Sequence, residues 1–162
     1  MACIYLGIGS NSSDKGVKIN EALKLLEEKI GIIVAKSHIY ETEPWGFECN
    51  DNFLNMAVEI NTNLTPEEIL LSCKNIEKSL GREKSTKNKY DSRTIDLDIL
   101  FYKNEIIKTS AMVIPHASIE KRLFVLLPLN DIAPHYVHPV LKENITTLLQ
   151  KCTDTCWIKR IL

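Results

Sequence analysis

The stretch Phe53-Leu54-Asn55-Met56-Ala57-Val58-Glu59-Ile60 decides the fold, because two kinds of residue alternate along it. Residues two apart on a β-strand project from the same face of the sheet. One face of this strand carries only apolar side chains: Leu54, Met56, Val58 and Ile60. The opposite face carries Phe53, Asn55, Ala57 and Glu59. We expect the apolar face to lie under helices and the mixed face to remain available for a ligand.

Two amphipathic helices flank this strand along the chain. In each, apolar residues recur at i, i+4, i+7 and i+11, the spacing of one helix face. The two sets are Ile19, Leu23, Leu26 and Ile30, and Ile69, Cys73, Ile76 and Leu80. The second helix has a complete start signal in Thr65, Pro66 and Glu68. Gly31 and Gly81 are placed to end the two helices.

Three further segments have the composition of strands: residues 3–8, 32–40 and 95–102. In the last, alternation puts Ile95, Leu97, Ile99 and Phe101 on one face and Asp96 and Asp98 on the other. The resulting order β-α-β-β-α-β predicts an α+β, ferredoxin-like antiparallel sheet with helices on one face. We expect the last third of the chain to be a C-terminal extension with a short helical segment before Leu129 and a helical turn at 145–149.

The composition limits the class of protein. With 162 residues, 44% of them hydrophobic, the chain has the length of one domain, which we expect to span 1–162. Its 20 basic and 21 acidic residues give a net charge of -1, too little to attract nucleic acid or a membrane surface. The first residues lack the basic leader and long apolar run of a secretory signal, and five cysteines form no paired framework. We therefore expect a cytoplasmic protein with reduced thiols.

Asp96 and Asp98 form the most informative pair in the sequence. On a strand they project side by side, about 7 Å apart, and would repel each other. A divalent cation, or two bridged by carboxylate oxygens, relieves that repulsion and can hold phosphates. An exposed polar strand face is the alternative interpretation of the same pattern.

The neighbouring segments favour phosphate and ring binding. Residues 82–93 contain five basic residues against two acidic ones, so this loop carries a local charge of +3. Its arginines, Arg82 and Arg93, can bind phosphate oxygens in bidentate fashion. On the central strand, Phe53 and Asn55 could stack on a flat heterocycle and hydrogen-bond its edge. The sequence thus predicts a metal, a cationic loop and a ring-binding surface on one side of one sheet.

Nearly the whole chain resembles the hydroxymethyldihydropterin pyrophosphokinases. The matching motifs occur in the family's order: residues 6–11 (Leu-Gly-Ile-Gly-Ser-Asn), 37–46 (Ser-His-Ile-Tyr-Glu-Thr-Glu-Pro-Trp-Gly), 52–55 (Asn-Phe-Leu-Asn), 81–82 (Gly-Arg), 93–99 and 113–116 (Val-Ile-Pro-His). The Arg-x-x-Asp-x-Asp signature at 93–98 is the most specific of them. The resemblance implies a monomeric enzyme that transfers the β,γ-pyrophosphoryl unit of ATP to 6-hydroxymethyl-7,8-dihydropterin, without nucleic-acid or membrane partners.

The resemblance also implies roles for individual residues. It implies that Asp96 and Asp98 bind two Mg²⁺ ions and that Arg82 and Arg93 neutralise the phosphates during catalysis. On the nucleotide side it implies Glu77, Ile99, His116 and Arg122. On the pterin side it implies Thr42, Pro44, Trp45, Phe53, Asn55 and Phe124, with the pterin between the two phenylalanine rings.

The loop at 82–93 departs from the family pattern. Where many members have Trp-Gly-Pro before the arginine, this chain has Tyr90-Asp91-Ser92, and Lys84 stands where a second arginine is common. Loss of the glycine and proline changes the freedom of the backbone, and lysine cannot form the planar fork of arginine. The departure bears on loop closure and ATP affinity and leaves the expected type of reaction unchanged.

Three alternatives remain at this point. Gly9-Ser10 followed by an Asp-x-Asp strand also suits a metal-dependent nucleotidyltransferase, although the two motifs lie far apart here. A ferredoxin-like module that binds RNA or a small regulatory ligand is the non-enzymatic alternative; RNA recognition on such a sheet uses several stacked aromatics and a basic surface, whereas this chain has few aromatics and a net charge of -1. His135 with His138, and Cys152 with Cys156, have spacings that zinc ligands can adopt, against ordinary packing of the C-terminal segment.

Overall fold

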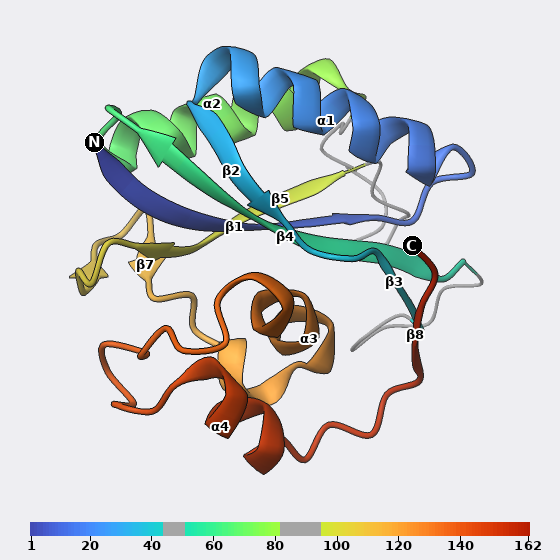
Figure 1. Cartoon of the computed structure of the whole chain (residues 1–162). Coiled ribbons are helices and arrows are strands. Elements are labelled where there is room, and N and C mark those ends of the chain that lie inside the picture. Colours follow the sequence, from blue (N-terminus) through green and yellow to red (C-terminus); the bar gives the residue numbers. More distant parts are fainter. Residues whose placement is uncertain (44–50, 82–94) are drawn as a thin grey trace.

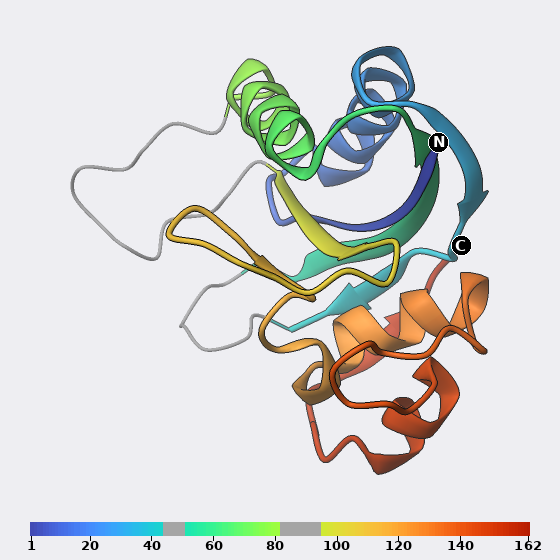
Figure 2. The ribbon, with the colours of Figure 1, turned by 90° about the vertical axis from the view of Figure 1, so that its left-hand side faces the viewer.

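A single antiparallel sheet forms the middle layer of the protein, with helices on both sides (Figures 1 and 2). This computed structural model describes residues 1–43, 51–81 and 95–162. The strand order is β5-β1-β4-β3-β8, and β2 also pairs with β4. The strand bounds are β1 Ala2–Ser10, β2 Ile32–Lys36, β3 Tyr40–Thr42, β4 Phe53–Thr62, β5 Asp96–Tyr102 and β8 Ile158–Arg160. Two short strands, β6 (Ile107–Lys108) and β7 (Val113–Ile114), pair with each other in a second sheet.

The predicted central strand is confirmed as β4, which pairs with β1 on one side and with both β2 and β3 on the other. The strand expected at 32–40 is interrupted, because β2 pairs with residues 58–61 and β3 with residues 53–55. Between them, the Ser37 hydroxyl accepts a hydrogen bond from the N–H of Ala57 at 2.9 Å. The side chain therefore replaces a ladder bond where the edge strand breaks.

The two predicted helices are α1 (Lys15–Lys29) and α2 (Pro66–Ser79). The start of α2 is the expected capping box, in which Glu68 N–H donates to Thr65 Oγ1 and Thr65 N–H donates to the Glu68 carboxylate. Gly81 follows α2 with φ of 94°, a left-handed conformation that favours glycine. Gly31 ends α1 for a different reason, because a Cβ there would lie 2.2 Å from the Asn61 carbonyl oxygen.

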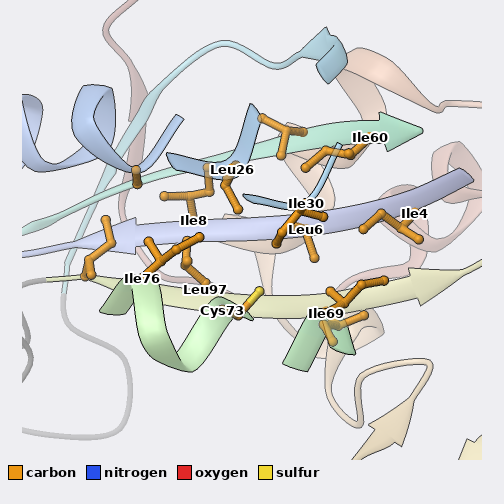
Figure 3. Packing of buried hydrophobic residues seen from close by; sticks show 14 of the residues in the cluster. Ile4, Leu6, Ile8, Leu26, Ile30, Ile60, Ile69, Cys73, Ile76 and Leu97 are labelled. Carbon is orange, nitrogen blue, oxygen red and sulfur yellow. The ribbon is translucent and has the colours of Figure 1, made fainter. Parts of the chain in front are cut away.

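The first hydrophobic core lies between the sheet and these two helices (Figure 3). It is built from alternate strand residues and from the apolar faces of the helices, as expected. From the strands it takes Ile4, Leu6, Ile8, Leu54, Met56, Val58, Ile60, Ile95, Leu97 and Ile99, and from the helices Ile19, Leu26, Ile69, Cys73 and Ile76. Close packing of these side chains fixes both helices on this face.

The opposite face requires a correction, because helices cover part of it as well. The segment expected only as an extension forms a 3₁₀ turn (Ile119–Lys121), α3 (Leu123–Ile132) and α4 (Ile145–Lys151). A second core joins them to the sheet through Tyr5, Ala57, Leu100, Phe101, Ile119, Leu126, Leu129, Ala133, Ile145 and Leu148. Pro128 lies inside α3. None of the helices in the described part of the chain is long and apolar enough to cross a membrane.

Phe101 is the clearest local error of the sequence interpretation. Simple alternation put it beside Ile99, but it belongs to the second core. The pairing of β1 with β5 shifts register between Tyr5 and Leu6, whose partners are Phe101 and Ile99. Leu100 is the extra residue of this β-bulge, and one extra residue turns every later side chain to the other face.

Candidate active site

A cavity of about 370 Å³ opens on the far face of the sheet, beside the second core. Its floor comes from β1, β4 and β5, and its walls come from the end of β3 and the start of α3. It is lined by Gly7, Ile8, Gly9, Thr42, Glu43, Phe53, Asn55, Met56, Ala57, Asp96, Asp98, Leu100, His116, Arg122, Phe124 and Val125. The sheet face that we expected to be available for a ligand therefore contains a cavity, and its lining residues range in sequence from Gly7 to Val125.

Asp96 and Asp98 both line this cavity, as their alternation on β5 predicted. The neighbouring strand places Gly9 opposite Asp96 and Gly7 opposite Asp98. Because glycine has no side chain, the sheet surface next to both carboxylates stays open. Two carboxylates facing such a space are the oxygen donors that Mg²⁺ takes, usually together with substrate phosphates. The donor set therefore fits this ion.

Glu77 lies on the other side of β5 and does not line the cavity. Its side chain is buried, and its Oε1 accepts a hydrogen bond of 2.8 Å from the N–H of Leu97. Leu97 is the residue between the two aspartates, so Glu77 holds the main chain that carries them. Ile99 likewise belongs to the first core and not to the cavity lining.

The ring-binding side is built around Asn55, which is buried on β4. Its Nδ2 donates a 2.7 Å hydrogen bond to Thr42 Oγ1 on β3. A Cβ at Gly9 would come within 3.0 Å of Asn55 Oδ1, so the glycine allows the amide to stay where it is. Phe53 from β4 and Phe124 from α3 line the same cavity. An amide, a hydroxyl and two aromatic rings are thus gathered from β3, β4 and the distant helix α3.

Two basic residues also reach the cavity from the segment between β7 and α3. His116 is positioned by its N–H, which donates 3.1 Å to the Leu100 carbonyl of β5. Arg122 immediately precedes α3, and its guanidinium lies 5.6 Å from the centroid of the Phe124 ring. This cation–π contact helps to position the guanidinium beside the cavity.

Some predicted site residues lie outside the described part of the chain: Pro44, Trp45, Arg82 and Arg93, together with Lys84 and Tyr90. Other cavity residues were missed by the sequence interpretation, notably Gly7, Gly9 and Glu43. The glycines carried a usable signal, because alternation on a strand put both on the face of Asp96 and Asp98. Glu43 carried none, since its position depends on a distant segment.

One residue of each pair considered for zinc, His138 and Cys156, has hydrogen-bond partners within the protein. His138 is buried, and its Nδ1 accepts hydrogen bonds from the N–H groups of Val140 and Leu141, both at 3.1 Å. Burial lowers the pKa of His138, against a smaller raising effect of Glu120. Cys156 lies beside Asp154, and burial, followed by the charge of Asp154, raises the pKa of its thiol to about 12. Among residues 1–43, 51–81 and 95–162, no group of three or more potential ligands gathers around a possible metal position.

Comparisons with known proteins show what this chain is similar to. The sequence profile of the family 7,8-dihydro-6-hydroxymethylpterin-pyrophosphokinase (HPPK) matches residues 5–134. The 2-amino-4-hydroxy-6-hydroxymethyldihydropteridine pyrophosphokinase of Aquifex aeolicus is 43% identical over 145 residues, covering 90% of this chain and 89% of that protein. The enzyme of the same name from Methylorubrum extorquens is 42% identical and covers 99% of both chains.

Longer proteins contain a related region. The folic acid synthesis protein FOL1 of Dictyostelium discoideum is 42% identical over 89% of this chain, which spans only 21% of that protein. The crystal structure of Plasmodium falciparum HPPK-DHPS with pteroate superimposes with a TM-score of 0.76 at 21% identity, over 93% of this chain and 42% of that one. At that identity the superposition supports the fold alone.

Proposed function

Because the chain belongs to the 7,8-dihydro-6-hydroxymethylpterin-pyrophosphokinase family, we propose that its cavity is the active site for that reaction. The reaction transfers the pyrophosphoryl group of ATP to 6-hydroxymethyl-7,8-dihydropterin and gives AMP and the pterin diphosphate used in folate biosynthesis. One observation carries the assignment to this cavity: the Asp96–Asp98 pair and the Phe53–Asn55 pair line the same hollow. In this proposal the first pair serves the phosphates and the second pair serves the ring, within one cavity of about 370 Å³.

For the phosphates, we propose that Asp96 and Asp98 hold two Mg²⁺ ions together with the oxygens of ATP. Bound there, these ions supply charge neutralisation and Lewis-acid activation of the phosphorus that is attacked. His116 and Arg122 lie on the cavity wall and bind nucleotide phosphates. Arg82 and Arg93 belong to the same proposal on the family pattern alone. Glu77 acts indirectly, through the Leu97 N–H that it holds.

For the pterin, we propose that Phe53 and Phe124 stack on the two faces of the ring and that Asn55 and Thr42 bind its polar edge. The Asn55–Thr42 hydrogen bond fixes both polar groups before the ligand arrives, which lowers the entropic cost of binding. Pro44 and Trp45 complete this subsite in the same proposal. The pterin hydroxymethyl group then points toward the aspartates.

The proposed chemistry is a direct, in-line displacement. The hydroxymethyl oxygen of the pterin attacks the β-phosphorus of ATP, the bond to the α-phosphate oxygen breaks, and AMP leaves. The protein contributes orientation, charge and exclusion of water, and forms no covalent intermediate. We also propose that the chain acts as a single-domain monomer in the cytoplasm. A reducing compartment keeps thiols reduced, which suits the free cysteines Cys3, Cys73, Cys152 and Cys156.

The nucleotide product tests this function directly. The protein is incubated with ATP, Mg²⁺ and 6-hydroxymethyl-7,8-dihydropterin, and the nucleotides are separated over time. We expect AMP in equal amount to pterin diphosphate, and none when the pterin is omitted. Release of ADP would indicate an ordinary kinase, and release of pyrophosphate would indicate a nucleotidyltransferase; either result contradicts the proposal.

A further inference from the structure

The two walls of the cavity come from β3 and α3. The strand wall consists of Thr42 and Glu43, at the end of β3. The helix wall consists of Phe124 and Val125, in the first turn of α3. β3 ends at Thr42 and α3 begins at Leu123, so the distance between the two walls depends on contacts between segments distant in sequence. On the proposed function, that distance decides how well a flat ring fits.

At the far end of the two elements, Asp131 of α3 joins them directly. Its carboxylate accepts hydrogen bonds from the N–H of His38 at 3.0 Å and from the hydroxyl of Tyr40 at 2.9 Å. Burial, followed by this carboxylate, raises the pKa of Tyr40 to about 12, and the protonated hydroxyl is the donor in this contact. This contact fixes the end of β3 that lies away from the cavity.

At the cavity end of β3 and α3, the C-terminal segment of the chain connects the two elements, as Asp131 does at the far end. The backbone of Trp157 forms two hydrogen bonds with Glu43. The Glu43 N–H donates to the Trp157 carbonyl at 3.4 Å, and the Trp157 N–H donates to Glu43 Oε1 at 2.9 Å. Three residues earlier, Asp154 Oδ2 accepts 2.9 Å from the N–H of Leu123, the first residue of α3. The other oxygen of Asp154 accepts from the N–H of Cys156, also at 2.9 Å. Residues 154–157, here named the clamp, therefore touch Glu43 of the strand wall and Leu123, the residue directly before Phe124 of the helix wall.

The strand that follows holds the clamp in place. β8 pairs with β3 along its whole length, with Ile158 opposite Thr42 and Arg160 opposite Tyr40. Beyond it, Ile39 and the final residues exchange two further backbone hydrogen bonds of 2.9 Å. Figure 1 shows this last segment rising from α4 to the edge of the sheet beside β3. The clamp lies outside residues 5–134, the region that the family profile matches.

We propose that the clamp sets the separation of the strand wall and the helix wall, and that Asp154 is the positioning residue through which it tunes affinity for the pterin ring. The carboxylate is suited to this because it bonds the first free N–H of α3 and, at the same time, closes the turn that presents Trp157 to Glu43. It touches no substrate in this proposal. It acts through Leu123 on Phe124 and through Trp157 on Glu43.

The test compares Asp154→Ala, Asp154→Asn and the control Thr155→Ala, which changes an exposed neighbour in the same turn. Steady-state KM values for the pterin and for ATP are measured, and pterin affinity is titrated by its own fluorescence with and without a non-reacting ATP analogue. We expect Asp154→Ala to raise both the pterin KM and Kd about tenfold, the scale of one hydrogen bond to a charged group. Asp154→Asn keeps one acceptor oxygen and is expected to fall between. The ATP KM should change less than twofold, and Thr155→Ala should match the wild type.

Each other outcome is also decisive. Equal pterin affinity in Asp154→Ala and Thr155→Ala overturns the clamp. Asp154→Ala could lose its melting transition together with its affinity for both pterin and ATP, which would indicate general unfolding. Asp154→Asn then provides the test, and the absence of a selective loss of pterin affinity in that variant overturns the clamp. If the wild type and Thr155→Ala release no AMP, the proposed function fails, while the fluorescence titration still tests the clamp.

Discussion

The two faces of the central sheet are made from alternate residues of the same strands, yet they differ in kind. The face toward α1 and α2 is filled by branched aliphatic side chains along its whole length. The far face is divided: Phe101 and Leu100 pack against α3 and α4, whereas Gly7, Gly9 and the two aspartates bound a hollow. Figure 2 shows the helices of both layers with the sheet between them.

The comparison shows how one sheet can provide stability and a binding site together. The face toward α1 and α2 supplies the close packing on which the fold depends. On the far face, Gly7 and Gly9 of β1 have no side chains to fill the space in which a ligand would lie. The first turn of α3 borders this space and does not cover it. Substitutions on one face should therefore change stability, and substitutions around the hollow should change catalysis.

The largest separation of the two effects is expected at the aspartates. Asp96→Ala or Asp98→Ala should lower kcat/KM by about 10³-fold or more, equivalent to about 4 kcal/mol, because in the proposed function each variant removes a ligand of the metal ions that hold the phosphates. The free energy of unfolding should change by less than about 0.5 kcal/mol. Glu105→Ala, an exposed carboxylate just after the same strand, is the control and should remain active. Near-normal turnover in either aspartate variant would remove the metal assignment.

The converse effect is expected in the first core. Leu26 of α1 is fully buried, and Leu26→Ala should lower the free energy of unfolding by about 3 kcal/mol through lost burial and a cavity. Turnover per folded molecule should stay near that of the wild type. Urea unfolding measures the first quantity, with Val17→Ala on the exposed side of the same helix as control. An equal loss in both variants would contradict the packing described for this face.

A smaller effect, confined to the hollow, is expected at Gly9. In Gly9→Ala the new Cβ would lie 3.0 Å from Asn55 Oδ1 and would displace the amide. We expect the pterin KM to rise about tenfold, or about 1.4 kcal/mol, with little change in thermal stability. Gly7→Ala is the matched variant, because its Cβ would meet only Leu100 at 3.6 Å, an ordinary contact. If the two variants had equal pterin KM values, Asn55 would not be the group that Gly9 protects.

The smallest effect concerns pH and the edge of the second core. The pKa of His138 is lowered in the folded protein, mainly by burial. Above pH 6.5, the ordinary pKa of histidine, His138 is neutral in both the folded and the unfolded protein, and folding carries no cost from its protonation. As the pH falls through 6.5, His138 takes up a proton in the unfolded chain first, so the free energy of unfolding declines. His138→Asn keeps an acceptor near the Val140 and Leu141 N–H groups but does not titrate. Its stability should fall less between pH 7 and pH 5 than that of the wild type, measured by urea unfolding at each pH.

Local patterns predicted much of the fold and part of the site. The capping box of α2, the alternation of β4 and the pairing of Asp96 with Asp98 depend on near neighbours, and all three are confirmed. Phe101 was assigned to the wrong face because a bulge arises from the pairing of β5 with β1, which no pattern within β5 reveals. Glu77 could not be placed either, since a glutamate at the end of a helix shows its buried partner only once the strand packs beneath it.

By itself, the sequence determined which residues share a face, because side-chain direction follows from the periods of strand and helix. It also predicted a phosphate-binding chemistry, because two carboxylates two apart on a strand, next to a cationic loop, are a donor set that a divalent cation can use. Only the tertiary structure decided where the far face is closed and where it is open. That outcome depends on contacts between segments distant in sequence, such as Asp154 with Leu123, 31 residues apart, and Trp157 with Glu43, 114 residues apart. Their formation depends on the packing of the whole chain.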